Sequence, residues 1–109
     1  MPFRFCVSGS VCEAESGRPL LDLVVRAYDH DLVADDFLGE SRTDADGYFA
    51  IVFTQLAFRD VVESRPDLYL KVFDGTGTRL LASTRSELRK KAGAEERFEV
   101  RVPRAALER

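Results

Sequence analysis

Hydrophobic and polar residues alternate along much of this chain with a period of two residues. The alternation is clearest in residues 3–12, FRFCVSGSVC, and in residues 96–102, ERFEVRV. A period of two is typical of a β-strand that turns one face to the core and the other to solvent. Both segments are therefore predicted to be β-strands.

Five further segments also predict strands, because each is rich in apolar, β-branched or aromatic residues and is bounded by turn residues. They are residues 20–29, 37–42, 48–54, 68–74 and 79–84. Residues 55–66 fit neither period and predict a short helix or an irregular crossover, which Pro66 ends. The tail after residue 102 is expected to fray. Seven short strands indicate one all-β domain over residues 1–109, an antiparallel Greek-key β-sandwich.

Composition and charge narrow the classes of partner. The chain has 109 residues, of which 45% are hydrophobic, enough for one core. Its net charge of -3, with basic residues interspersed among acids, gives no reason to expect a nucleic-acid partner. It contains neither a long apolar stretch nor a secretory signal pattern, so a cytoplasmic protein is expected and membrane association is not.

The two cysteines are expected to be free thiols. Cys6 and Cys12 lie six positions apart in one predicted strand, which separates them by about 20 Å. A disulfide cannot span that distance. A hairpin turn at residues 8–10 is the alternative that would allow the bond.

Several short motifs, taken in order, resemble the transthyretin-like or prealbumin-like sandwich superfamily, which includes carboxypeptidase regulatory-like domains. These motifs are Val7-x-Gly9-x-Val11, Ser16-Gly17-Arg18-Pro19-Leu20, Val25-x-Ala27-x-Asp29, Thr43-Asp44-x-Asp46-Gly47-x-Phe49 and residues 67–72. The resemblance implies the sandwich fold. It implies little about function, because the superfamily is functionally mixed.

An acidic segment follows the second predicted strand. Asp29, Asp31, Asp35 and Asp36 place four carboxylates within eight positions, and calcium binds six to eight such oxygen ligands. The segment also resembles the calcium-binding loops of synaptotagmin-type lipid-binding domains. It therefore predicts a calcium site, with Asp74 as a further ligand. The alternative is a solvated acidic loop that arginines neutralise.

Two neighbouring features favour simpler interpretations. Residues 44–47, DADG, predict a hairpin turn. His30 is the only histidine and is expected to be an exposed loop residue. No nucleophile accompanies it in a pattern typical of catalysis. Transthyretin-related hydrolases depend on several histidines, and the structurally related ring-cleaving dioxygenases use His and Tyr iron ligands, neither of which this chain can match.

The sequence thus predicts a non-catalytic binding or structural module. Calcium would stabilise it, and it would present loops or an edge strand to a partner protein or to a second copy in a homodimer. The alternative is a calcium-dependent binder of membranes or polysaccharides. That alternative needs exposed apolar residues beside the metal, for which Leu32, Val33 and Phe37 are candidates.

Overall fold

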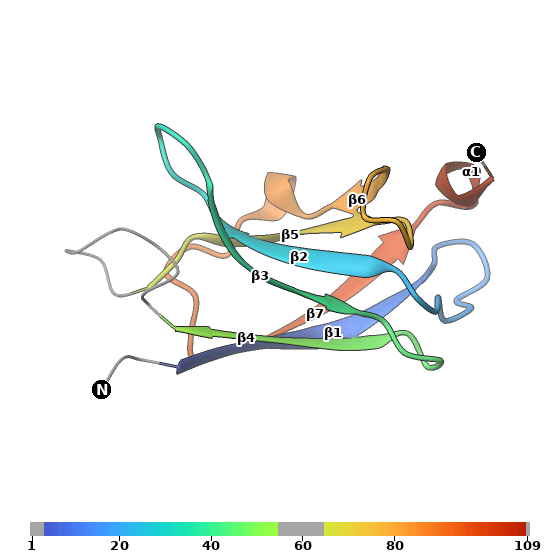
Figure 1. Cartoon of the computed structure of the whole chain (residues 1–109), viewed down its shortest axis with the longest axis horizontal. Coiled ribbons are helices and arrows are strands. Elements are labelled where there is room, and N and C mark those ends of the chain that lie inside the picture. The colour runs from blue at the N-terminus through green and yellow to red at the C-terminus, as the bar shows by residue number, and fades with distance from the viewer. Residues whose placement is uncertain (1–3, 55–64, 109) are drawn as a thin grey trace.

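A computed structural model describes residues 4–54 and 65–108, which form two stacked β-sheets (Figure 1). The strands are β1 (Arg4–Glu13), β2 (Val24–Asp29), β3 (Asp36–Arg42), β4 (Tyr48–Thr54), β5 (Leu68–Phe73), β6 (Leu80–Ser83) and β7 (Glu95–Val102). A 3-10 turn, η2 (Arg85–Glu87), follows β6, and a short helix, α1 (Arg104–Leu107), follows β7. The prediction of an all-β sandwich with seven strands is confirmed.

One sheet has the strand order β4-β1-β7 and the other β3-β2-β5-β6. All pairs are antiparallel except β1 and β7, which run parallel with Cys6 opposite Glu95 and Glu13 opposite Val102. The first sheet is therefore mixed and not purely antiparallel as predicted. The period of two could not show this, because it reports which face is buried and not the direction of the neighbouring strand.

The core lies between the sheets and consists of the alternate residues that the period of two marks as apolar. Each strand of the first sheet contributes three of these buried residues, which β2 and β5 meet from the second sheet. They are Phe5, Val7, Val11, Phe49, Ile51, Phe53, Phe98, Val100, Val102, Val25, Ala27, Leu68, Leu70 and Val72. The side chains on the outward faces of both sheets are therefore not part of this core.

Segment boundaries differ from the predictions at three places. β2 begins at Val24 and not at residue 20, because Asp22 has a φ of 65°, which no strand residue adopts. The tail is not frayed at residues 104–107, because the Arg104 guanidinium of α1 donates to the buried Glu13 at 3.1 Å. The predicted crossover falls mostly on residues 55–64, which lie outside the described residues.

Two smaller predictions are confirmed. Cys6 and Cys12 are free and lie on one continuous strand, without a hairpin between them. Asp44 and Gly47 close the predicted turn through the Gly47 N–H, which donates to the Asp44 carbonyl at 2.9 Å. No helix among the described residues is long and apolar enough to cross a membrane.

Candidate functional site

The structure separates the five predicted calcium ligands into two groups. Asp29 ends β2 and lies opposite Asp36 on β3, and the intervening loop carries Asp31 and Asp35. Asp74 follows β5, which runs antiparallel to β2. The length of a six-residue strand, about 20 Å, therefore lies between Asp74 and Asp29, and they cannot share an ion.

The carboxylates near the β2–β3 loop are already engaged by protein donors. Asp29 is buried and accepts the Asp67 N–H at 2.8 Å. Burial and the charges of neighbouring aspartates raise the pKa of Asp29 to about 6, although the Asp67 N–H opposes this shift. Asp31 accepts the Val33 N–H at 3.2 Å and remains exposed.

Over residues 4–54 and 65–108, no group of three or more His, Cys, Asp and Glu side chains is placed to hold one metal ion. The aspartates are close in the sequence, but their side chains serve separate hydrogen-bonding networks. Calcium binding stays a prediction.

Asp35 is the centre of a hydrogen-bonded cluster. Its Oδ1 accepts from the His30 ring Nδ1 at 3.0 Å and from the Asp31 N–H at 3.1 Å. Its Oδ2 accepts from the Tyr69 hydroxyl and lies 3.8 Å from the Arg85 Nε. Burial alone would raise the pKa of Asp35, but the hydrogen bonds from Tyr69, Asp31 and His30 outweigh it and hold this pKa below its usual value. Asp35 is therefore a carboxylate at neutral pH.

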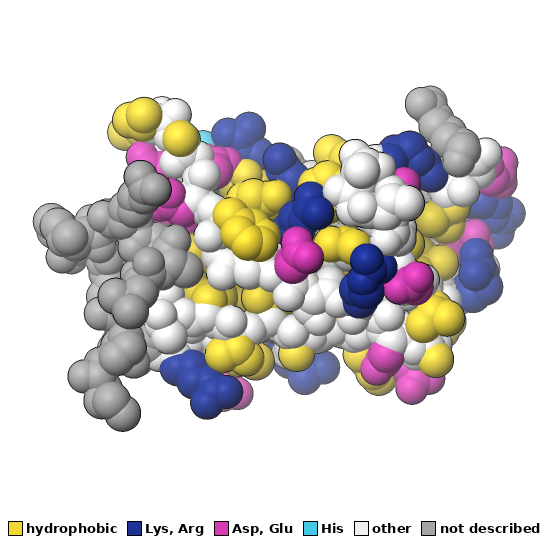
Figure 2. Space-filling view, in the orientation of Figure 1, with side chains coloured by type: hydrophobic (Ala, Val, Ile, Leu, Met, Phe, Trp, Pro, Cys, Tyr) yellow, Lys and Arg dark blue, Asp and Glu magenta, His cyan; other side chains and the backbone are white. Residues whose placement is uncertain are grey.

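Tyr69 reaches Asp35 from the outward face of the second sheet. Tyr69 and Tyr28 are cross-strand partners whose rings stack with centroids 5.3 Å apart. Phe37 contacts the Tyr28 ring edgewise at 5.9 Å, and the Lys71 amine lies 5.1 Å from the Tyr28 ring centroid. Figure 2 shows hydrophobic side chains lying beside basic ones on the visible face of the molecule. The outward face is thus an aromatic and cationic surface.

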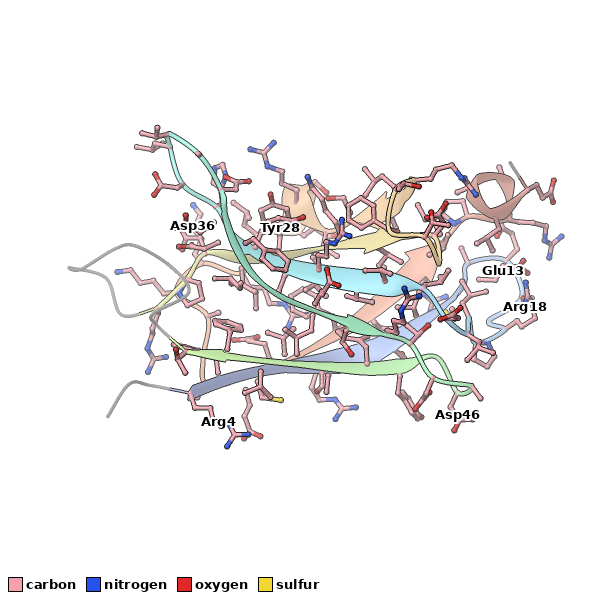
Figure 3. The ribbon with its side chains drawn as sticks, in the orientation of Figure 1. Arg4, Glu13, Arg18, Tyr28, Asp36 and Asp46 are labelled. Atoms are coloured by element: carbon pink, nitrogen blue, oxygen red, sulfur yellow. The ribbon has the colours of Figure 1, made fainter. Side chains whose placement is uncertain are left out.

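A cleft of about 550 Å³ opens between this face and the β2–β3 loop, and we call it the Asp35 cleft. Its lining residues are Tyr28, His30, Asp31, Leu32, Val33, Ala34, Asp35, Tyr69, Lys71 and Arg85. Leu32 and Val33, at the loop tip, are almost fully exposed, and Phe37 is about half exposed. In Figure 3, Tyr28 and Asp36 lie toward one end of the sandwich, away from Glu13 and Arg18.

His30 is not the exposed loop residue that the sequence predicted. Its side chain is 29% exposed and is held by Asp35 at one ring nitrogen. An ionised carboxylate can only accept, so His30 donates its Nδ1 proton to Asp35, and the Arg85 Nη2 lies 3.4 Å from the same nitrogen. The other ring nitrogen, Nε2, is then left as an acceptor, and a His–Asp pair of this kind can take up and return a proton.

Four lining residues were not identified as functional from the sequence: Tyr28, Tyr69, Lys71 and Arg85. The available signal is the outward face of two strands, where the sequence places aromatic and basic residues in place of small polar ones. That signal becomes informative only when β2 and β5 are known to be neighbours.

Comparisons with known proteins find solved structures of similar fold. No family model matches this chain, and neither does any curated protein. A 9R-lipoxygenase from Cyanothece PCC8801 is similar in structure, with a TM-score of 0.67 and 20% identity over 93% of this chain. The dioxygenase domain of a carbohydrate-binding fusion protein from Streptomyces sp. SirexAA-E has a TM-score of 0.57 and 18% identity over 94% of this chain. A chlorocatechol 1,2-dioxygenase from Pseudomonas putida has a TM-score of 0.55 and 9% identity over 94% of this chain.

The extent of these matches differs between the similar structures. This chain spans 16% of the lipoxygenase, 81% of the Streptomyces dioxygenase domain and 61% of the chlorocatechol dioxygenase. At these identities the likeness shows the fold. None of the comparisons tests the transthyretin-like resemblance, which stays a prediction.

The comparisons correct the prediction of a non-catalytic module, and with it the alternative of a membrane or polysaccharide binder. The similar structures are oxygenases, so this sandwich is a fold that enzymes use. The prediction rested on the single histidine, His30, and on the lack of a nucleophile beside it. Here His30 and Asp35 meet Tyr69 from a strand 34 residues further along the chain.

Proposed function

We propose that this chain is a dioxygenase-related β-sandwich domain that binds a small aromatic anion in the Asp35 cleft, with His30 as its acid–base group. The observation that carries this proposal is the 3.0 Å hydrogen bond between His30 and Asp35 at the wall of the cleft. A carboxylate that orients an imidazole and stabilises its protonated form is a recurring arrangement in acid–base catalysis.

The other lining residues support an aromatic anion as the ligand. Lys71 and Arg85 supply positive charge on one side of the cleft, and Tyr28 and Tyr69 supply ring surface. Aromatic rings stack offset or edge to face, and cations attract carboxylates and phenolates. A catechol supplies the ring, and loss of one hydroxyl proton gives the phenolate that the cations would stabilise; the similar Pseudomonas putida enzyme is a chlorocatechol dioxygenase.

The residues give a simple proton-transfer step. His30 Nε2 accepts the proton of a bound phenolic hydroxyl, the O–H bond breaks, and its electron pair stays on the ligand oxygen. Asp35 stabilises the imidazolium through Nδ1–H, and Lys71 or Arg85 stabilises the phenolate. Each of these groups lines the same cleft.

The iron that ring-cleaving dioxygenases hold with His and Tyr ligands does not fit these residues. The chain has one histidine, and its Nδ1 is directed to Asp35. Burial and the hydrogen bond to Asp35 raise the pKa of Tyr69, which disfavours the phenolate that iron ligation requires. No step of the proposed mechanism therefore passes through iron.

The single histidine makes the proposal directly testable. Protein labelled with ¹⁵N-histidine gives one imidazole spectrum by NMR, and it is expected to show the tautomer protonated at Nδ1. Titration with chlorocatechol or benzoate should shift the His30 signals saturably. The Arg85→Gln variant should weaken this binding about tenfold, because it removes one charge-assisted contact.

Arg101→Gln is the matched control, since it removes an exposed arginine from β7, outside the cleft, and should bind as the parent protein does. The proposal fails if neither compound moves the His30 signals at millimolar concentration. It also fails if Arg85→Gln and Arg101→Gln bind equally well.

As part of the same proposal we assign the protein to a reducing compartment such as the cytoplasm. The free thiols Cys6 and Cys12 support this assignment, because disulfides are rare where thiols are kept reduced.

A further inference from the structure

β7 forms one edge of the first sheet in the described structure. The Cys6 N–H donates to the Ala94 carbonyl at 2.8 Å, and the Ala14 N–H donates to the Val102 carbonyl at 2.9 Å. In a parallel pair, the backbone N–H and C=O groups of every second residue point toward the neighbouring strand. The even-numbered residues of β7 thus bond to β1, and the N–H and C=O groups of the odd-numbered residues point to the free edge.

The free edge of β7 is long and regular. β7 has eight residues, and its pairing with β1 has no register shift. The edge strands of the second sheet differ, because β6 has only four residues and β3 pairs with β2 through an irregularity at Ala27/Tyr28. Short strands, bulges and charged side chains protect an edge from pairing with another chain, and of these β7 has only the charged side chains.

The odd-numbered residues of β7 also carry alternating charges. Glu95, Arg97, Glu99 and Arg101 are all exposed on the outward face of the sheet. Consider a second β7 that runs antiparallel, with the two-fold axis at Phe98. Glu95 then faces Arg101 of the second copy, and Arg97 faces Glu99 of the second copy. All four positions meet an opposite charge.

Other registers are less favourable. A shift of two residues in either direction places Glu opposite Glu and Arg opposite Arg, and like charges directly opposite each other destabilise a sheet. A shift of one residue directs the free backbone groups of one copy at residues whose groups are bonded to β1. The register with its axis at Phe98 satisfies both the backbone and the charges.

β4, the other edge strand of this sheet, has no such alternation of charges. Its outward residues Tyr48, Ala50 and Val52 are exposed and uncharged, so they fix no register.

We propose that this protein forms a two-fold symmetric dimer through antiparallel pairing of the β7 edges, which joins two three-stranded sheets into one of six strands. Pro103, which has no N–H, ends this edge after Arg101.

Sedimentation and light scattering across micromolar to millimolar concentrations test the proposal. The parent mass should rise from 12.3 kDa toward twice that value. Arg97→Glu and Glu99→Arg each create two like-charge pairs across the axis, so each should raise the dimer Kd about tenfold or more. The double variant R97E/E99R restores opposite charges at both positions and should return the Kd to within about threefold of the parent value.

Glu87→Arg is the control, because it makes the same charge change as Glu99→Arg on an exposed residue of η2. It should leave the Kd unchanged. Circular dichroism on each variant separates loss of pairing from loss of folding. A parent protein that remains monomeric at millimolar concentration overturns the proposal. A dimer that persists in both single variants, or that the double variant does not recover, overturns it as well.

Discussion

Asp29 and Asp35 have opposite pKa shifts although both lie at the β2–β3 loop. Burial dominates at Asp29, where one backbone N–H does not compensate for lost hydration and the charges of Asp67, Asp36 and Asp31. Donors dominate at Asp35, where a tyrosine, an imidazole and a backbone N–H converge. The number of donors that reach each carboxylate therefore decides its ionisation.

The Asp29→Asn variant should gain stability relative to the parent protein as the pH rises. The folded-state pKa of Asp29 is about 6, above the ordinary value of 3.8 for an aspartate, so the folded state favours the protonated form. The contribution of Asp29 to the free energy of unfolding of the parent protein is fully present at low pH. It falls by up to about 3 kcal/mol between about pH 4 and pH 6. Urea unfolding of both proteins at pH 4 and pH 7 measures the difference. If the two proteins differ in unfolding free energy by the same amount at pH 4 and at pH 7, the pKa of Asp29 is not raised.

Tyr69→Phe should destabilise the fold by about 1–3 kcal/mol, because it removes the hydroxyl that donates to the Asp35 carboxylate from a buried ring. Tyr48→Phe is the matched control, since Tyr48 is 55% exposed and should change stability by less than about 0.5 kcal/mol. Thermal unfolding of the two variants tests this expectation. Equal effects would show that the Tyr69 hydroxyl contributes nothing.

At the scale of elements, β1 is the strand on which the first sheet depends. It pairs with β4 on one side and with β7 on the other. Gly9 lies midway along it and against the backbone of β7: a Cβ atom at this position would lie 1.8 Å from the Phe98 carbonyl oxygen. Only glycine allows this approach.

Gly9→Ala should therefore destabilise the protein by about 3 kcal/mol or more, because the backbone of β7 cannot yield as a flexible side chain would. Ser8→Ala, one residue earlier and on the outward face, should cost less than about 1 kcal/mol. Chemical denaturation of the two variants gives both values. A mild effect at Gly9 would show that β1 and β7 are further apart than described.

At the scale of the whole molecule, the two ends of the sandwich have different electrostatics. One end gathers Asp29, Asp31, Asp35 and Asp36. At the other end Glu13 accepts from Ser16, Arg18 and Arg104, and the bond from Arg104 is the main cause that lowers the pKa of Glu13 to about 2. Glu13 is therefore neutralised by its own neighbours, whereas the aspartates of the first end share the surface with Lys71 and Arg85.

The calcium prediction is tested by a thermal melt with calcium and then with a chelator. An ion that binds only the folded protein at 100 times its Kd adds about 2.7 kcal/mol, which raises the Tm of a domain this size by roughly 10 °C or more. The Asp31→Asn variant should lose most of that rise. A parent protein whose Tm is the same with calcium and with chelator would contradict the prediction.

The sequence predicted the strands well because burial determines their pattern. Six of the seven begin within one residue of the predicted position, and β2 is the exception because the positive φ of Asp22 interrupts the extended chain. Strand direction and pairing were less accessible. The parallel pair of β1 and β7 and the remote position of Asp74 both depend on tertiary contacts that no local pattern encodes.

The same limit applies to the site. The sequence drew attention to the segment that holds His30 and Asp35, but it predicted Asp35 as a calcium ligand and His30 as an exposed loop residue. The partners that define the cluster, Tyr69 and Arg85, come from β5 and η2. Periodicity marked Tyr69 as an outward residue without showing what covers it.

The parallel pairing of β1 and β7 also sets the order in which the molecule can assemble. Of the described strands, β1 is synthesised before all the others and β7 after them, so the first sheet stays incomplete until residues 95–102 have left the ribosome. Contacts between such distant segments slow folding, because the loop must close before any pairing offsets its entropy. Until then the nascent chain exposes the β1 edge, and a chaperone that covers this edge would protect it from aggregation.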